Sequence, residues 1–126
     1  MKKSDIRHIL TRLGIAVVFV SIGMWEIIQP SYWSFYMPQF LSVIASTTTL
    51  TMIHGVAMLA IGLAVLLGIY VRIASALATL MMVFIVADLV IFFGFNDIVI
   101  RDIAILIMAL SLFFDDTRWL ALKKKW

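Results

Sequence analysis

The chain has 126 residues, of which 64% are hydrophobic and only 13% are charged, and its mean hydropathy is +1.13. Soluble domains carry about 25% charged residues, so this composition excludes an ordinary soluble protein. The net charge of +3 comes from basic flanks and gives no reason to expect nucleic-acid binding. The absence of cysteine excludes disulfides, thiolate metal sites and iron–sulfur ligation within the chain.

Four apolar segments predict four transmembrane helices in a single domain that comprises residues 1–126. Each segment is close to the roughly 20 residues that cross a hydrocarbon core about 30 Å thick. Backbone groups in lipid must satisfy their own hydrogen bonds, so segments of this length form helices. We expect the helices at approximately residues 9–28, 50–69, 73–93 and 97–116.

Basic residues give the orientation of these helices. They open the first helix, lie between the second and third, and follow the fourth, so the positive-inside rule places both termini in the cytoplasm. The first helix lacks a small-residue cleavage site and is expected to remain as an anchor. The result is a multi-pass protein of the cell (plasma or inner) membrane. The orienting residues are Lys2, Lys3, Arg7, Arg12, Arg72, Arg118, Lys123, Lys124 and Lys125.

Two of these basic residues, Arg12 and Arg72, lie at the inner boundary of the predicted helices. Arginine has a long apolar stem that can lie along the helix while its charged head reaches water. We therefore expect both side chains to extend to the lipid headgroups.

An uncharged aromatic segment, residues 30–42, follows the first helix. Pro30 ends that helix, because proline cannot continue its hydrogen-bond ladder. Tyr32, Trp33 and Phe35 are residues of the kind that collect at the membrane–water boundary. We expect a short helix or re-entrant turn in the outer interface, which acts either as a lipid anchor or as a lid over a site below it.

The remaining connections are short and carry capping residues. Ser46–Thr49 offers an N-cap for the second helix, and Asn96 or Asp97 offers one for the fourth. Short loops make successive helices antiparallel neighbours. The predicted fold class is therefore all-α, an integral membrane four-helix up-down bundle.

Every predicted helix has an ionisable residue near its outer end. These residues lie at similar depth and on faces rich in small residues, so we expect one polar cluster enclosed by the bundle. Arg101 is expected to pair with Asp88 on the neighbouring helix, or with Asp97 one turn earlier. Gly55 and Gly62, seven residues apart, predict a close-packed seam in the second helix. The candidate ligand-binding residues are Glu26, His54, Asp88, Arg101 and Asp102.

The same residues also admit a structural interpretation, in which a buried ion-pair network fixes helix register. His54 is then a hydrogen-bonded core histidine. Glu26, His54 and Asp88 show no metal-ligand spacing, so no metal site is predicted. His8 and His54 lie at opposite ends of the predicted bundle, which excludes a bis-histidine haem.

Several short motifs run through the chain. They are Arg12-Leu13-Gly14, Gly23, Gln29-Pro30-Ser31-Tyr32-Trp33, the Gly62 to Gly68 run, Arg72 and Arg101-Asp102. On these residues nearly the whole chain resembles the DoxX family of small four-helix membrane proteins. The founding members of that family are subunits of a membrane thiosulfate:quinone oxidoreductase, and others accompany different redox or stress-response complexes.

The resemblance implies a membrane subunit of a redox complex, quinone-linked, whose polar site binds a quinone headgroup, a small oxyanion or a partner subunit. Arg101 would supply cationic hydrogen bonds, and Glu26, Asp88 or His54 would exchange protons. Catalysis by this chain alone is not expected, and neither is a covalently bound cofactor. The expected partners are the lipid bilayer and other membrane subunits.

Two other functions remain open. One is a non-catalytic scaffold or assembly subunit of a larger membrane complex, whose bundle simply docks to that complex. The other is a small proton-coupled carrier, which would need polar residues across the whole bilayer. The middle of each predicted helix is apolar, and this argues against the carrier.

Overall fold

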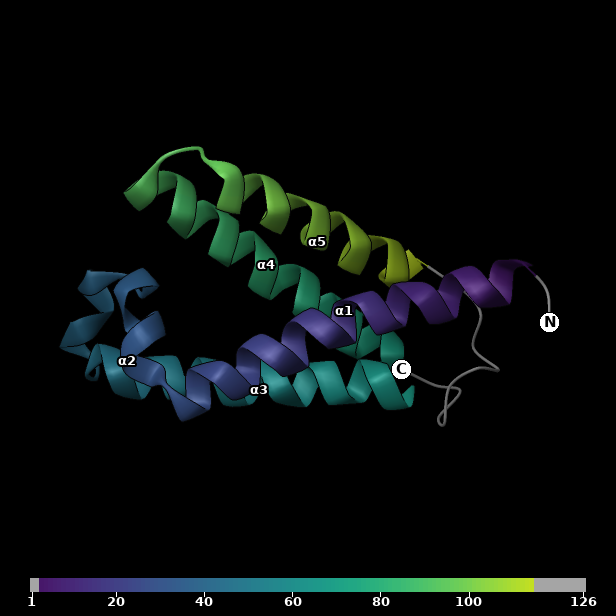
Figure 1. Ribbon diagram of the computed structural model, residues 1–126, viewed down its shortest axis with the longest axis horizontal. Helices are drawn as coiled ribbons and strands as arrows, with labels where there is room; N and C mark the ends of the chain where they lie inside the picture. Colours follow the sequence, from purple (N-terminus) through teal and green to yellow (C-terminus); the bar gives the residue numbers. More distant parts are fainter. Residues whose placement is uncertain (1–2, 115–126) are drawn as a thin grey trace.

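The computed structural model describes residues 3–114, and within this range the chain is helical without a strand (Figure 1). The predicted all-α class is confirmed for this range. The first helix begins at Lys3 rather than near residue 9, and the expected end of the last helix at residue 116 lies outside the described residues. The elements in chain order are α1 (Lys3–Ile28), α2 (Pro30–Trp33), the 3-10 helices η1 (Ser34–Tyr36) and η2 (Gln39–Val43), α3 (Thr47–Leu67), α4 (Val71–Phe93) and α5 (Asp97–Phe114).

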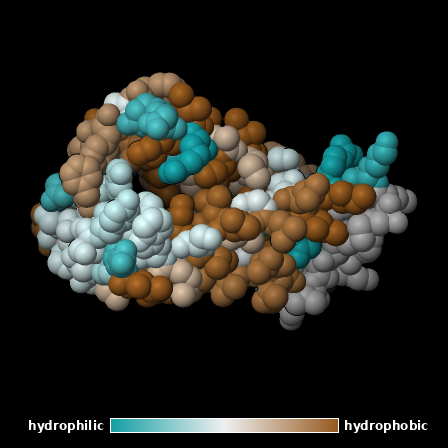
Figure 2. Space-filling model, in the orientation of Figure 1, coloured by the Kyte–Doolittle hydropathy of each residue, from teal (hydrophilic) through white to brown (hydrophobic). Residues whose placement is uncertain are grey.

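Three of these helices contain a segment long and apolar enough to cross a membrane, namely Ile6–Ile28, Thr47–Leu67 and Val71–Phe93. The space-filling view shows the hydrophobic surface that these helices present between more hydrophilic ends (Figure 2). α5 is not among the three, and its 18 described residues include three charged side chains. The structure is therefore that of a membrane-type helical protein, and the fourth span stays a prediction.

Local side chains fix where the helices begin and end. The Ser46 hydroxyl oxygen accepts a hydrogen bond from the Thr49 N–H at 3.2 Å and caps α3. α3 ends at Leu67, and the next residue, Gly68, is its C-cap with a φ of 77°, a left-handed conformation that suits glycine. The Asn96 side-chain oxygen Oδ1 accepts a hydrogen bond from the Val99 N–H at 3.2 Å and caps α5. Both predicted caps are confirmed.

The long helices form two antiparallel pairs, α1 with α3 and α4 with α5. The pairs approach each other where α3 ends and α4 begins, and they separate toward the opposite end (Figure 1). We call the second end the open end; the last turns of α1 and α4 and the first turns of α3 and α5 lie there. Among the buried residues of the core are Ile15, Phe19, Val65, Ala78, Ala109 and Leu112.

Glycine brings the backbones of α1 and α3 into contact. A Cβ atom added at Gly23 would lie 2.8 Å from both the Gly55 carbonyl oxygen and the Leu59 amide nitrogen. One added at Gly62 would lie 2.9 Å from the Phe19 Cβ. The predicted seam at Gly55 and Gly62 is confirmed, and its partner is α1. In lipid such close approach stabilises a helix pair through dispersion contacts.

Arg12 holds the same pair together at the end opposite the open end. It is only 8% exposed, and it donates hydrogen bonds from Nε to the Val65 carbonyl at 2.9 Å and from Nη2 to the Leu66 carbonyl at 3.1 Å. The expectation that Arg12 extends to lipid headgroups is wrong. The last carbonyls of a helix lack intrahelical donors and carry partial negative charge, so they bind the guanidinium instead.

Arg72, near the start of α4, makes a contact of a different kind. Its guanidinium carbon lies 5.1 Å from the centre of the Phe113 ring, a cation–π distance. This contact joins the start of α4 to the end of α5. Arg12 and Arg72 therefore each connect the two helices of one pair.

The aromatic segment, consisting of α2, η1 and η2, lies at the open end and bridges the two pairs. Trp25 of α1 stacks on Tyr32, with ring centroids 5.1 Å apart. On the other side Phe35 and Tyr36 lie 5.3 Å and 5.6 Å from the ring of Phe93 in α4. The predicted short helical conformation is confirmed, and its place in the membrane interface stays a prediction.

Candidate functional site

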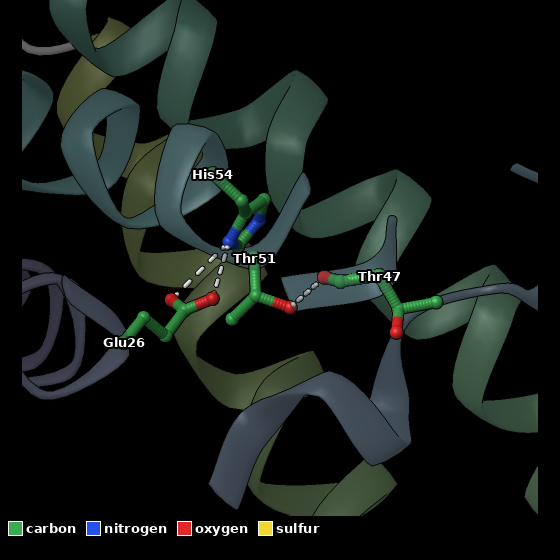
Figure 3. A network of polar contacts seen from close by, with 4 residues as sticks. All are labelled: Glu26, Thr47, Thr51 and His54. Atoms are coloured by element: carbon green, nitrogen blue, oxygen red, sulfur yellow. Dashed lines mark hydrogen bonds and ion pairs between the residues drawn. The ribbon is translucent and has the colours of Figure 1, made fainter. Parts of the chain in front are cut away.

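Glu26 and His54 form the principal polar contact at the open end. His54 Nδ1 lies 2.8 Å from Glu26 Oε1 and 3.2 Å from Oε2 (Figure 3). Glu26 is 5% exposed, and a buried carboxylate needs a hydrogen-bond partner to offset its lost hydration. The His54 Nδ1–H supplies that partner across the α1–α3 seam.

The seam itself makes room for this contact. A Cβ atom at Gly55 would lie 2.9 Å from the Glu26 Cβ, so glycine next to His54 lets the Glu26 side chain enter. Thr51 lies one turn before Gly55 in α3 and is fully buried. Its hydroxyl donates a hydrogen bond to the Thr47 carbonyl at 2.7 Å (Figure 3). Thr51 therefore satisfies its donor within α3 and does not compete for the Glu26 carboxylate.

The second ring nitrogen of His54 remains available. Both contacts to Glu26 use Nδ1, and Nε2 lies on the side of the ring away from Glu26 (Figure 3). The His54 side chain is 27% exposed, and Nε2 has no hydrogen bond to any residue within the range 3–114. A carboxylate on Nδ1–H fixes the tautomer and the ring orientation. The pair therefore presents an oriented group that can accept or donate a proton.

Arg101 and Asp102 form a separate pair on α5. Arg101 Nε donates to Asp102 Oδ1 at 3.3 Å, and the two side chains are 57% and 9% exposed. The expected pairing of Arg101 with Asp88 or with Asp97 is wrong. The Asp102 carboxylate is buried and lies on the adjacent residue, so it takes the Nε donor without any reach across the helices.

Two other polar atoms at the open end have unmet hydrogen-bonding capacity. Asp88 Oδ1 and Trp33 Nε1 are both buried and have no hydrogen-bond partner in the described part of the chain. Each unmet buried group costs about 1–3 kcal/mol, so these two atoms are candidate hydrogen-bonding partners for a ligand. Trp33 was not among the predicted site residues, because the sequence shows the indole and not the burial of its N–H.

The five predicted site residues thus fall into two groups rather than one cluster. Glu26 and His54 lie on the α1–α3 pair, whereas Asp88, Arg101 and Asp102 lie on the α4–α5 pair, and the pairs diverge at this end (Figure 1). Figure 2 shows a hollow in the surface there, with hydrophilic side chains beside it. No group of three histidine, aspartate or glutamate residues that could hold a metal ion occurs among the side chains that the structure describes.

The candidate site is defined by residues of the chain itself. They provide an oriented histidine, an exposed arginine and two unmet polar atoms at the open end of an apolar helical fold. No family model, no curated protein and no solved structure matches the chain.

Proposed function

We propose that the chain is a DoxX-like integral membrane subunit of a quinone-linked oxidoreductase complex, and that it binds the quinone headgroup at its open end. The observation that carries this proposal is the Glu26–His54 contact, which leaves Nε2 of an oriented histidine available. Trp33 Nε1 is an unused donor for a quinone oxygen, and Asp88 Oδ1 is an unused acceptor for a quinol hydroxyl. Arg101 supplies an exposed cation on the neighbouring pair.

In this proposal the chain exchanges protons with the quinone, and a partner subunit exchanges the electrons. Reduction of a quinone takes up two electrons and two protons, and oxidation of the quinol releases them. The chain has no cysteine, so it offers no cysteine-ligated centre, and the electrons pass between the quinone and the redox centre of a partner subunit. His54 and Glu26 exchange the two protons with the headgroup in succession, which is the usual role of a histidine with a carboxylate neighbour.

The membrane arrangement is part of the same proposal. α5 serves as the fourth span, the four long helices form an up-down bundle, and the open end faces the outside of a plasma or inner membrane. The band of exposed apolar side chains supports this arrangement (Figure 2). The positive-inside rule supports cytoplasmic termini, because nine of the ten basic residues then fall on one side.

A reporter at the C-terminus tests this topology. An alkaline phosphatase domain, active only outside the cytoplasm, is expected to give no activity when it is fused after Trp126. A fluorescent protein that folds only in the cytoplasm is expected to give signal at the same position. The reverse pattern would mean an odd number of spans and would remove α5 from the bundle.

Ligand-induced stabilisation tests quinone binding directly. A ligand that binds only the folded state raises its stability by mass action, by about 2.7 kcal/mol at one hundred times its Kd. We expect a short-chain ubiquinone or menaquinone analogue to raise the Tm of the detergent-solubilised chain. A parallel melting curve with thiosulfate and no quinone shows whether an oxyanion raises the Tm instead.

Trp33→Phe gives this experiment its matched variant. The substitution keeps an aromatic ring and removes a buried N–H that has no partner in the described part of the chain, so the Tm without ligand is expected to stay the same or rise, while the quinone-induced shift is lost. Trp25→Phe is the control, because the Trp25 N–H already donates to the Gln29 side chain at 2.9 Å. Equal quinone shifts in both variants would remove Trp33 from the site, and no shift with any analogue would overturn quinone binding.

A non-catalytic scaffold is the second candidate function, and the exposed guanidinium of Arg101 favours it, because a cation on an apolar helix suits docking to another subunit. On this alternative no small molecule shifts the Tm. A proton-coupled carrier has less support, since the buried polar residues of the described range lie toward the helix ends. These residues are His8, Arg12, Glu26, Thr51, Ser75 and Asp102.

A further inference from the structure

One flank of α5 differs from the rest of the exposed helical surface. Its residues follow one another at alternating steps of four and three, which places them in a single stripe along the helix. All are exposed except Met108, which is half-buried. We call this stripe the α5 flank; it consists of Asp97, Arg101, Ala104, Met108 and Ser111.

The α5 flank is poorly suited to contact with lipid. The bulky apolar side chains of α5 that lipid favours, Ile100, Ile107 and Phe114, are 57%, 61% and 71% exposed and lie farther round the helix. The flank instead offers two charges, a hydroxyl and an alanine. Small residues such as Ala104 and Ser111 let another helix approach closely. A charge within the bilayer is costly unless it finds a partner.

The charges on the flank are complementary to a second copy of the same flank. Arg101 uses its Nε to bind Asp102, and it makes no contact with Asp97 one turn earlier in the described structure. Four residues of helix rise by about 6 Å. When two α5 helices lie parallel about a two-fold axis, Arg101 of each copy therefore lies one turn from Asp97 of the other. An extended arginine side chain covers that distance, and the two resulting ion pairs are identical by symmetry.

We propose that a second copy of the chain docks on the α5 flank within the membrane, so that Arg101 of each copy pairs with Asp97 of the other. Ala104 then lies near the two-fold axis, where a small side chain allows the closest approach. This interface rests on the proposed position of α5 in the membrane, and it shares Arg101 with the proposed quinone site. It involves neither His54 nor Trp33, so the quinone-induced shift in Tm and its loss in Trp33→Phe test quinone binding separately from the dimer.

Because the chain has no cysteine, a single introduced cysteine reports the interface without background. Ala104→Cys in the full chain, expressed in its membrane and treated with a mild oxidant, is expected to form a disulfide-linked dimer. Such a bond requires Cα atoms within about 7 Å. The matched control is Leu110→Cys, which is 42% exposed on a different side of α5 and is expected to remain monomeric. Equal dimer yields from the two variants would overturn the proposal.

Charge reversal then tests the ion pair within the Ala104→Cys background. Arg101→Asp alone and Asp97→Arg alone are each expected to abolish the dimer, because like charges then face each other. Co-expression of the two differently tagged variants is expected to restore a mixed dimer, since each reversed charge meets its opposite in the other chain. A melting curve for each variant establishes that it is folded. Failure of the mixed pair to cross-link would exclude reciprocal Asp97–Arg101 pairing, as would undiminished cross-linking of either single variant.

Ala104→Leu gives an independent check that changes no charge. Position 104 is exposed in the single chain, so the larger side chain is expected to leave the monomer folded. It is expected to reduce dimer formation, measured as the monomer fraction in detergent by light scattering, because it separates the two helices. An unchanged dimer fraction would contradict docking on the α5 flank.

Discussion

His54→Ala is expected to lower the free energy of unfolding by about 1–3 kcal/mol, the usual cost of leaving a buried hydrogen-bonding group without its partner. Glu26 is 5% exposed, and within the described residues its carboxylate contacts only His54, at 2.8 Å and 3.2 Å. The variant would leave that carboxylate buried without a donor. The measurement is equilibrium unfolding in mixed micelles with increasing SDS.

Two further variants separate the loss of the contact from the loss of side-chain volume. Glu26→Gln keeps a carbonyl oxygen that accepts from the His54 Nδ1–H, so it is expected to cost about 1 kcal/mol, the difference between a hydrogen bond to a charged acceptor and one to a neutral acceptor. The double variant Glu26→Leu with His54→Leu removes both polar groups and is expected to recover most of the stability. The single variants Glu26→Leu and His54→Leu complete this cycle, and if their two losses simply add in the double variant, the side chains do not interact.

Arg101→Gln provides a contrast on the other pair of helices. Its side chain is 57% exposed, and exposed ion pairs contribute about 0–1 kcal/mol. We therefore expect this variant to unfold within about 1 kcal/mol of the wild type. A loss as large as that of His54→Ala would mean that the buried Asp102 carboxylate depends on Arg101 as strongly as Glu26 depends on His54.

Much of this fold could be predicted from the sequence, because apolar length and local capping act over short distances. Runs of apolar residues gave the long helices, and Ser46 and Asn96 marked where two of them begin. Gly55 and Gly62 marked a seam, since glycine at helical spacing has little other use in lipid. Each of these predictions depends on one helix and its immediate neighbour.

The candidate site was harder to predict, because it depends on how helix pairs diverge. Helical periodicity shows that Arg101 and Asp88 lie at similar depth, but it does not give the angle between helices. The aromatic segment lies between the two pairs at the open end, where Phe35 rests on Phe93, and Glu26 and Arg101 end up on different pairs. The prediction for Arg12 was wrong for a related reason, because helical periodicity indicates the depth of this residue but not its distance from the carbonyls at the end of α3.

Gly23→Ala is expected to destabilise the chain by about 1–3 kcal/mol, the usual cost of overpacking, although alanine is the better helix former by about 1 kcal/mol. The added Cβ would lie 2.8 Å from the Gly55 carbonyl oxygen and 2.8 Å from the Leu59 amide nitrogen. Both are backbone atoms, so they yield only if α1 and α3 move apart. That movement also lengthens the neighbouring Glu26–His54 contact.

Gly14→Ala is the matched control in the same helix. Its added Cβ would meet only the Met108 Cε, at 2.7 Å, and the tip of a methionine side chain moves easily. The gain in helix propensity then outweighs the cost of this contact, so Gly14→Ala is expected to leave the free energy of unfolding unchanged or to raise it in the same SDS titration. The two variants make the same chemical change at glycines of α1, and only the rigidity of the opposing atoms differs. If Gly23→Ala unfolds like Gly14→Ala, the backbones of α1 and α3 are not in contact, and the position of Glu26 beside His54 needs another explanation.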